Sequence, residues 1–324
     1  MKSAAVPVEG RNAVPEHEPA WQRLGRHGGA NLAVACAQLA GWAALLTVLD
    51  TRSLPWAARA AALAGFCLMM QGVFTMLHEY AHRNAHARPA LNYLIGWITG
   101  TIFGTAPTLM QVQHWGHHRR NRTESERGEF IHEDEDAWSK RVRYYAAILG
   151  GLWLGSFIFP ILAPLLPYRA LAWLGRDERF NTYAAGCKDI TPREWRRLRI
   201  EGLAFLAAWV SLLRFGPWHW QTLAIAYASF AFTWSSLQWV YHLNTPIHVV
   251  EGAYNLRLPG PLRLLFLNFN YNLTHHRQPS LPWQELRARS DQRETQPMWY
   301  RYALVFLPPR PFPQDHSSLA KRHF

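Results

Sequence analysis

Apolar residues in this chain gather into long continuous runs, which polar or charged segments separate. Residues 30–49 and 56–77 are each about long enough to cross the hydrocarbon core of a bilayer as a helix, and a short polar turn joins them. This pattern predicts a transmembrane helical hairpin. A second pair of apolar segments, 200–213 and 220–240, predicts another hairpin further along the chain.

Three further apolar segments do not have the form of simple spans. Residues 91–110 are interrupted by glycines and a proline, and they must bring the chain back to the side it left, because a histidine cluster follows at once. Residues 144–167 contain three prolines and are predicted to be re-entrant or interfacial. Residues 262–269 are short and amphipathic, which is typical of a helix that lies on the membrane surface.

The segment 169–199 is rich in Lys and Arg, and by the positive-inside tendency it stays in the cytoplasm. Near its end the sequence Thr191-Pro192-Arg193-Glu194 combines an N-cap threonine, a proline at the first helical position and a glutamate placed for a capping box. A helix is therefore predicted to begin at Thr191, basic in its first turns and apolar afterwards.

Charge and composition agree with a membrane protein. The 324 residues carry a formal net charge of +12, and the charges flank the apolar runs, which favours contact with lipid over nucleic acid. Many of the 16 tryptophans lie in or at the ends of these runs, as interfacial aromatic residues do. Three cysteines allow neither a disulfide framework nor a CxxC metal site.

These patterns predict an all-α integral membrane protein with about four transmembrane helices and additional re-entrant or interfacial helices. We expect residues 1–28 to be a flexible cytoplasmic lead without a cleavage site, so that the first span is an uncleaved anchor. Residues 29–290 would form the membrane domain. Residues 291–324 are a proline-rich tail for which we expect little regular structure after Trp299.

Eight of the 16 histidines fall in four places, each next to an apolar segment on the side assigned to the cytoplasm. The spacing HxxxH puts two imidazoles on one face of a helix, one turn apart. Imidazole is a common ligand for iron, copper and zinc, and eight histidines suffice for two metal ions. The predicted metal ligands are His78 and His82, then His114, His117 and His118, then His242, and finally Asn272, His275 and His276.

His118 and His242 can belong to one site only if the chain crosses the membrane an even number of times between them. The predicted hairpin 200–240 supplies two crossings. For His242 alone, an interfacial polar residue is an equally good interpretation. We expect the remaining histidines to be ordinary surface or interfacial residues: His17, His27, His86, His132, His219, His248, His316 and His323. Glu79 and the acidic run 133–136 are candidates to orient ligands, although a solvated loop explains the run better.

The clusters HEYAH, HWGHH and NLTHH, in this order, resemble the three histidine boxes of the membrane fatty acid desaturase superfamily. That superfamily also includes acyl hydroxylases, acetylenases, and carotenoid ketolases and hydroxylases. Residues 272–283 are similar to the third box and its proline-containing continuation in bacterial acyl desaturases, and the whole resemblance runs from about residue 63 to residue 286. The boxes are specific for the superfamily but do not distinguish its members.

The resemblance implies four transmembrane helices with a cytosolic cap, and two non-haem irons held by the box histidines and one additional histidine, a position that His242 fits. It also implies O2 as co-substrate, removal of two hydrogens from an acyl lipid or acyl thioester, and an external electron donor of the ferredoxin or cytochrome type. A bacterial inner-membrane protein with a cytoplasmic active site is expected. The sequence departs from the superfamily pattern at Asn272, where the third box usually has histidine. An amide oxygen can ligate a metal or hold a water on it, but it binds more weakly than imidazole.

Other functions remain open. The same iron site would serve a lipid or carotenoid hydroxylase, a ketolase or an acetylenase. A metal transporter or receptor would need ionisable residues within the spans, which are nearly free of them, and a haem protein would place paired histidines within its helices. No flavin, nicotinamide or rubredoxin-like motif is present, so a partner must deliver electrons; Arg119, Arg120, Arg122 and the basic stretch 193–199 would dock an acidic donor or lipid head groups.

Overall fold

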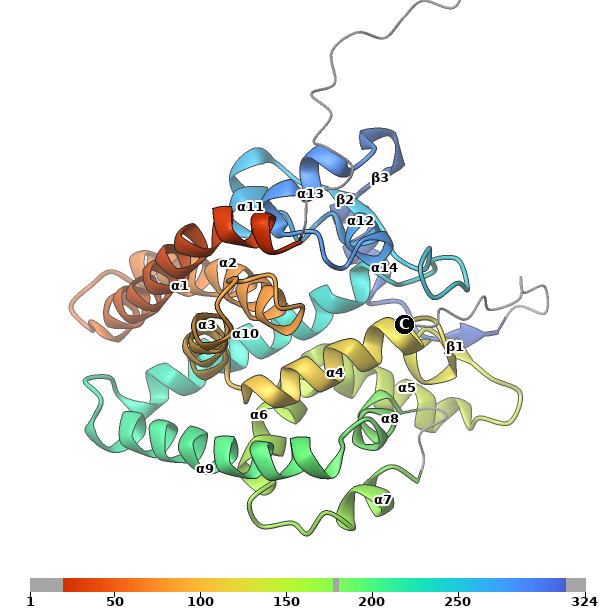
Figure 1. Cartoon of the computed structure of the whole chain (residues 1–324), viewed down its shortest axis with the longest axis horizontal. Coiled ribbons are helices and arrows are strands. Elements are labelled where there is room, and N and C mark those ends of the chain that lie inside the picture. The colour runs from red at the N-terminus through yellow and green to blue at the C-terminus, as the bar shows by residue number, and fades with distance from the viewer. Residues whose placement is uncertain (1–19, 177–180, 313–324) are drawn as a thin grey trace, which may run out of the picture.

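The computed structural model describes residues 20–176 and 181–312, which form a helical bundle with very little sheet (Figure 1). Within this part of the chain, four helices of at least 21 residues make the frame. At about 1.5 Å per residue, each is long enough for a bilayer core of about 30 Å. They are α1 (Ala20–Asp50), α2 (Trp56–Ala81), α9 (Pro192–Phe215) and α10 (Trp220–Val240). The predicted all-α membrane fold is confirmed.

Three stretches of the described chain are both long and apolar enough to span a membrane: His27–Asp50, Trp56–Ala81 and Ala137–Leu162. The first two are the predicted hairpin. The predicted second hairpin, 200–213 and 220–240, is helical but is absent from this set, because arginines in α9 and polar residues in α10 lower the hydropathy. Composition alone therefore selects a different third span from the one expected.

Packing nevertheless pairs α9 and α10 with the first hairpin. The two long hairpins turn at the same end of the bundle, on the left in Figure 1, where His219 Nδ1 lies 3.0 Å from Asp50 Oδ2. Beside this contact, Trp218 Nε1 donates a hydrogen bond of 3.0 Å to Thr47 Oγ1. The two hairpins therefore reach the same depth, as two pairs of crossing helices would.

The stretch Ala137–Leu162 is broken and turns back. Gly150 has φ +132°, a left-handed conformation that interrupts the helix. Beyond it the chain returns along α9: the Phe157 and Trp209 rings lie 5.0 Å apart, and Pro164 O accepts a hydrogen bond of 2.8 Å from Arg199 Nη2, near the start of α9. This path agrees with the predicted re-entrant segment. Its parts are α5 (Ala137–Ala146), η2 (Ala147–Gly151) and α6 (Leu152–Leu162).

A second short hairpin carries the HWGHH cluster. Its helices are α3 (Pro89–Phe103) and α4 (Pro107–Arg120). α3 runs antiparallel to α2 as far as the Phe103 ring, which lies 5.8 Å from Phe74, and Gly104 then reverses the chain at φ +99°. α4 runs back until Trp115 Nε1 donates to Ala81 O over 3.0 Å. The predicted return of residues 91–110 to the same side is confirmed.

α9 begins as predicted. Thr191 Oγ1 accepts a hydrogen bond from Glu194 N (3.3 Å), and the Glu194 carboxylate accepts one from Thr191 N (2.8 Å), which together form a capping box. Two turns later, the buried Glu201 carboxylate accepts a hydrogen bond of 2.8 Å from Thr108 N, in the first turn of α4. α9 therefore holds the start of the helix that carries the HWGHH cluster.

Edge-to-face aromatic pairs fill the centre of the bundle. The Phe230 ring of α10 lies 6.5 Å from the Phe66 ring of α2 and 5.6 Å from the Phe103 ring of α3. The Phe103 ring also lies 5.0 Å from the Trp234 ring of α10. Tyr227 OH donates a hydrogen bond of 2.6 Å to the carbonyl oxygen of α3 at Ile102. Such pairs stabilise a core beyond the area they bury, and they place a rigid aromatic wall below the histidines.

Short elements cover the end of the bundle where the histidines lie (Figure 1). Thr75 Oγ1 of α2 donates to Phe266 O over 2.9 Å, which fixes part of this cap on the bundle. The elements are η1 (Glu124–Glu126), α7 (Ala170–Leu174), α8 (Thr182–Lys188), α11 (Gly260–Leu265), α12 (Asn272–Arg277), α13 (Trp283–Arg289), η4 (Gln292–Glu294) and α14 (Met298–Leu304). Two parallel strand pairs are described: β1 (Phe130–Ile131) with β4 (Arg310–Pro311), and β2 (Asn255–Arg257) with β3 (Thr295–Pro297).

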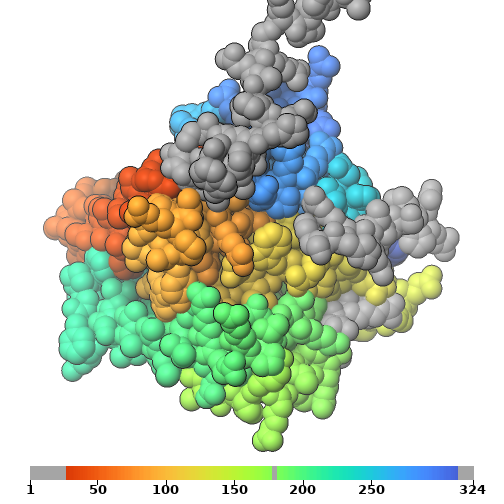
Figure 2. Space-filling view, in the orientation of Figure 1, coloured from red at the N-terminus to blue at the C-terminus, as the bar shows by residue number. Residues whose placement is uncertain are grey.

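The space-filling view shows how closely the cap sits on the bundle. Residues from about 250 onward, in light to dark blue, lie directly against the first hairpin and against α4 (Figure 2). Asn31 Nδ2 of α1 donates a hydrogen bond of 2.9 Å to Ala85 O, and Asn31 Oδ1 accepts one of 3.0 Å from Trp283 Nε1 of α13. The start of the first hairpin is therefore part of the support for the cap.

The two ends of the chain are only partly described. Residues 1–19 of the predicted lead and 313–324 of the predicted tail lie outside the described residues, and α1 begins at Ala20, within the predicted lead. Regular structure continues after Trp299, contrary to our expectation. Met298 and Val305 are buried, and Tyr144 OH donates to Val305 O over 2.6 Å, so apolar contacts with the bundle order a segment whose prolines suggested otherwise.

Candidate metal centre

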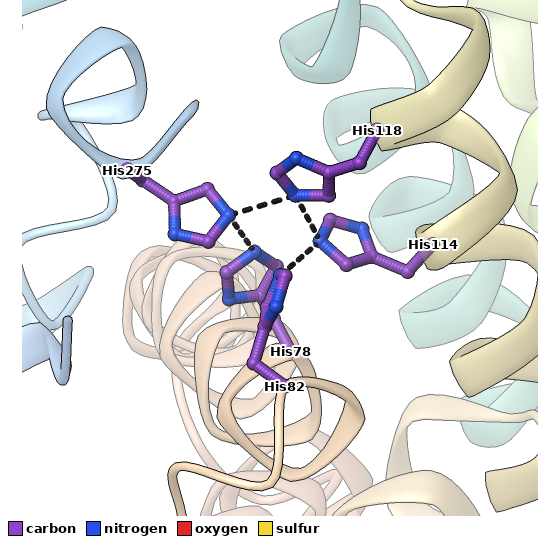
Figure 3. Close-up of side chains that lie close together, drawn as sticks. All are labelled: His78, His82, His114, His118 and His275. Carbon is purple, nitrogen blue, oxygen red and sulfur yellow. Dashed lines mark hydrogen bonds between the residues drawn. The ribbon is translucent and has the colours of Figure 1, made fainter. Parts of the chain in front are cut away.

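The eight histidines predicted as ligands lie in two adjacent groups at one end of the bundle. In the first, which we call the five-histidine group, one ligand nitrogen from each residue lies within 4.8 Å of all the others (Figure 3). The second, the three-histidine group, meets the same criterion. The five-histidine group is His78, His82, His114, His118 and His275, and the three-histidine group is His117, His242 and His276.

Helical spacing accounts for four members of the five-histidine group. His78 and His82 are one turn apart at the end of α2, and His114 and His118 are one turn apart at the end of α4, so each pair shares a helix face. Figure 3 shows the two pairs facing each other, with His275 closing the group from α12. The Nε2–Nε2 distances are 2.7 Å for His82–His114 and 3.0 Å for His114–His118, His118–His275 and His78–His275.

These short contacts suit a metal better than hydrogen bonding. A neutral imidazole nitrogen carries either a proton or a lone pair, so one proton cannot serve two neighbours. His118 Nε2 and His275 Nε2 each lie 3.0 Å from two other ring nitrogens, and the contacts cannot all be satisfied together. Nitrogens at right angles around an ion at about 2.1 Å lie about 3.0 Å apart, which matches the arrangement.

Other groups orient the rings of the three-histidine group. His117 Nδ1 lies 3.1 Å from Glu126 Oε2, and His242 Nδ1 lies 2.8 Å from Gly252 O. Because the acceptors are oxygens, both Nδ1 atoms carry a proton, which leaves Nε2 as the nitrogen available to a metal. The ring centroids of His117 and His276 are 5.2 Å apart and those of His242 and His276 are 5.0 Å apart.

Each histidine doublet is divided between the groups. His117 belongs to the three-histidine group and His118 to the five-histidine group, while His275 and His276 are shared in the opposite order. Consecutive residues on a helix point about 100° apart, so a doublet serves two positions at once. The rings of His118 and His276 are 4.5 Å apart, which makes the two groups neighbours.

Burial keeps the imidazoles neutral. Burial, together with neighbouring histidines, holds the pKa of His114, His118, His275 and His276 well below the usual value. The same causes lower the pKa of His242 to about 3. A metal binds the neutral ring, so these five histidines are in the protonation state that ligation requires at physiological pH.

Asn272 lies beside the three-histidine group. It is on α12, one turn before His276, and it lines a cavity together with His114, His117 and His242. The residue is buried, and its Oδ1 has no hydrogen-bond partner among the described residues. A buried amide oxygen without a partner is costly unless a ligand, an ion or water satisfies it.

The cavity has a volume of about 200 Å³ and runs from the histidines into the bundle. One part of its wall is apolar, and the other part is polar and comes mainly from α4, η1 and α8, with His242 and Asn272 beside it. The apolar part includes Phe74, Phe103, Leu152, Trp234 and Phe269.

The sequence did not point to Glu126, the carboxylate that contacts His117 directly. Glu126 contacts His117, accepts a hydrogen bond of 2.9 Å from Thr182 Oγ1 and lies 3.8 Å from Arg120 Nε. Burial alone would raise its pKa, but the His117 hydrogen bond and the neighbouring positive charges hold the pKa at about 2. Helical spacing could not link Glu126 to the HWGHH cluster, because a turn separates η1 from α4.

The other proposed acids lie elsewhere. Glu79 is 3.8 Å from His78 Nδ1, too far for a hydrogen bond, and its carboxylate instead accepts one of 3.2 Å from Trp283 N. Within the run 133–136, Glu135 is buried and pairs with Lys140 and Arg143, while its neighbours Glu133 and Asp134 are exposed. The run is therefore a surface loop in which Glu135 is buried and Asp136 caps α5, where it accepts a hydrogen bond from Ser139 N.

Histidines expected to be ordinary stay outside both groups where they are described. His86 accepts a hydrogen bond of 2.9 Å from Arg88 N, His132 packs against Phe312 and His219 contacts Asp50. His248 accepts hydrogen bonds from backbone N–H groups of its own loop, and His27 lies 3.4 Å from Glu285. His17, His316 and His323 lie outside the described residues.

Two of the arginines expected to dock a donor have internal roles. Arg122 is fully buried and pairs with Glu129 at 2.7 Å, and Arg120 pairs with Asp189. Arg119 also contacts Asp189 at 2.9 Å but remains half exposed. Only Arg119 of the three is placed to meet a partner or a lipid.

The fold and site together define an all-α membrane protein that gathers eight histidines from four segments beside an apolar cavity. The family model described as "Fatty acid desaturase" matches residues 54–308, a region that contains all eight. The chain belongs to the fatty acid desaturase family. A curated "Fatty acid desaturase" of Bacillus subtilis (strain 168) is 25% identical over 253 residues, which cover 71% of this chain and 66% of that relative.

Proposed function

We propose that this protein is a membrane-bound, O2-dependent, non-haem di-iron oxidoreductase that introduces a double bond into a fatty acyl chain. The observation that carries the proposal is the pair of histidine groups beside an apolar cavity, in a chain of the desaturase family. The desaturase name of the Bacillus subtilis relative supports the same activity.

The residues present fit two iron ions. Within each group the histidines offer ring nitrogens at short mutual distances, and imidazole suits iron. The five-histidine group would hold one ion, and the three-histidine group with Asn272 would hold the other. When bound, the pair would supply activation of O2 and removal of two hydrogens from an unactivated carbon chain.

The protein's own part is to position the chain and exclude water. Phe74, Phe269 and Trp234 give the cavity an apolar surface in contact with the histidines; the Phe269 and His78 rings are 5.0 Å apart. A methylene chain of an acyl lipid or acyl thioester is the matching substrate class. A dry cavity strengthens electrostatic interactions and prevents side reactions.

Electrons would come from a separate carrier protein of the ferredoxin or cytochrome type. The histidine groups lie at the same end of the bundle as the basic start of α9, which the positive-inside tendency assigns to the cytoplasm. We therefore place the active site on the cytoplasmic side of a bacterial inner membrane.

The second candidate is a lipid or carotenoid hydroxylase or ketolase, or an acetylenase, on the same scaffold. Asn272 is the observation that favours it, because an amide in place of an imidazole changes the ligand set of one ion. Hydroxylation inserts oxygen into the C–H bond from which desaturation would only remove hydrogen.

Product analysis tests the proposal. The protein is expressed in a host with a defined lipid composition, and the acyl chains and carotenoids are analysed by mass spectrometry. We expect acyl chains that have lost two hydrogens; a gain of one oxygen would indicate the second candidate. The variant His275→Ala should abolish the product, while His86→Ala, which removes a histidine outside both groups, should retain it. Purified protein that binds one iron or less per chain after full reconstitution would contradict the di-iron centre.

A further inference from the structure

We infer that Asn121, the residue that ends α4, is a positioning residue for His242, because it holds the backbone carbonyl that sets the His242 ring. This inference rests on the proposed function, because it takes His242 as a ligand of the metal centre. It gives a role to a fully buried polar residue that comes directly after the arginines that follow the HWGHH cluster.

Asn121 binds two carbonyl groups of the loop that follows His242. Its Nδ2 donates hydrogen bonds of 2.9 Å to Val249 O and of 3.2 Å to Gly252 O. The same Gly252 O accepts the hydrogen bond of 2.8 Å from His242 Nδ1. A carbonyl oxygen has two lone pairs, so it can accept both bonds at once. Asn121 therefore fixes the carbonyl that fixes the imidazole.

Arg122, the next residue, braces the segment that carries His242. Its side chain is fully buried and pairs with Glu129 at 2.7 Å. Glu129 Oε1 also accepts a hydrogen bond of 3.0 Å from Asn244 N, two residues after His242. Because a buried charge that loses its partner is costly, this ion pair keeps the end of α4 and the His242 segment together.

The loop and the end of α4 fit each other closely. A Cβ atom at residue 252 would collide with Arg122 Cγ, so only glycine allows the loop to lie this near to the chain after α4. Arg122 has φ +64°, a left-handed conformation that is strained for a residue with a side chain. Such strain persists only where the surrounding contacts over-determine it. The contacts on both sides therefore hold Asn121 in one place.

Asn121 also connects His242 with His117. Asn121 N donates a hydrogen bond of 2.7 Å to His117 O, in the last turn of α4. The His117 and His242 rings lie 4.8 Å apart. α4 thus places two members of the three-histidine group, His117 directly and His242 through Asn121.

Cobalt binding to the whole chain tests the inference. The protein is purified in detergent, and its Co(II) affinity at both groups is measured by competition against a chelator. Asn121→Leu keeps the approximate shape of the side chain but removes the donor. It should weaken binding at the three-histidine group by about 10–100-fold and leave the five-histidine group unchanged.

Asn31→Leu is the matched control. Asn31 is also fully buried, and its Nδ2 donates a hydrogen bond of 2.9 Å to a backbone carbonyl, that of Ala85. It lies in α1, away from the loop after His242, so Asn31→Leu should leave the three-histidine group at its wild-type affinity.

The proton spectrum of the Co(II) protein separates positioning from a general loosening. When histidines bind Co(II) through Nε2, their Nδ1–H protons give exchangeable signals far outside the ordinary range. In Asn121→Leu the His242 signal should shift and exchange faster with solvent. The His117 signal should stay, because Glu126 holds that ring independently. A merely structural role for Asn121 would move both signals.

Asn121→Ser keeps one donor on a shorter side chain and serves as the second variant if Asn121→Leu does not fold. It should weaken the same group by a smaller factor. A wild-type chain that binds no metal would contradict the proposed function. Wild-type affinity at the three-histidine group in the Asn121 variants would contradict the inference alone. So would an equal loss in Asn31→Leu, or His117 and His242 signals that change together.

Discussion

Glu126 shows how a single carboxylate sets the state of a ligand. It accepts a hydrogen bond from His117 Nδ1, and Thr182 and Arg120 hold it in place. A carboxylate behind a metal-binding histidine fixes the tautomer and makes the ring more basic, and its loss typically costs about 10–100-fold in metal affinity.

Glu126→Ala should therefore weaken binding at the three-histidine group by about 10–100-fold and leave the five-histidine group unchanged. Competition against a chelator of known affinity, with Co(II) as the probe, measures both positions. Glu133→Ala removes an exposed carboxylate from the acidic run and serves as the control. Equal affinities in the two variants would show that Glu126 does not orient His117.

At the scale of elements, α4 is held at its start by a residue of α9. The Glu201 carboxylate is 2% exposed and accepts hydrogen bonds from Thr108 N, Thr108 Oγ1 and Tyr93 OH at 2.7–2.8 Å. Each buried donor left without a partner costs about 1–3 kcal/mol. Arg197, also bonded to Glu201, is half exposed and adds little.

Glu201→Ala should lower the free energy of unfolding by more than about 2 kcal/mol, and it should also weaken metal binding because α4 carries three of the ligands. Thr191→Ala, which removes only the exposed N-cap at the start of the same helix, should cost about 1 kcal/mol. Thermal unfolding in detergent compares the two variants. A smaller effect for Glu201→Ala than for Thr191→Ala would overturn this ranking.

The re-entrant path depends on the backbone of Gly150. A non-glycine residue at φ +132° is strained by about 1–3 kcal/mol, so Gly150→Ala should destabilise the protein by that amount. Gly29 lies within α1, where an added methyl group would meet no other atom within 4 Å, and Gly29→Ala should stabilise the helix by about 0.5–1 kcal/mol. Unfolding midpoints of the two variants should move in opposite directions; a shift in the same direction would argue against strain at Gly150.

At the scale of the whole molecule, the arrangement of the hairpins predicts which surfaces face each side of the membrane. Cysteines introduced at Ser53 and Pro217, in the two exposed hairpin turns, should react with an impermeant maleimide in intact cells. Cysteines at Glu133 and Gln292, near the histidine end, should react only after permeabilisation. The background is Cys36→Ser, because Cys67 and Cys187 are buried. Protection of Pro217→Cys alongside reaction of Ser53→Cys would show that α9 and α10 do not cross.

The sequence by itself determined what depends on neighbours within one or two helical turns. The HxxxH spacing at His78 and His82, the capping box at Thr191 and the apolar length of the first hairpin all follow from backbone geometry that any helix shares. For the same reason, the set of eight candidate histidines and their separation from the ordinary ones could be predicted without coordinates.

Only the tertiary structure decided how those residues are combined. His78 and His275 are 197 residues apart in the chain but 3.0 Å apart in space, and their contact depends on how four segments pack, which no local spacing encodes. The division into five and three, the carboxylate of Glu126 behind His117 and the turn at Gly150 arise in the same way. Packing of distant segments, rather than local spacing, therefore decides which histidines share a group.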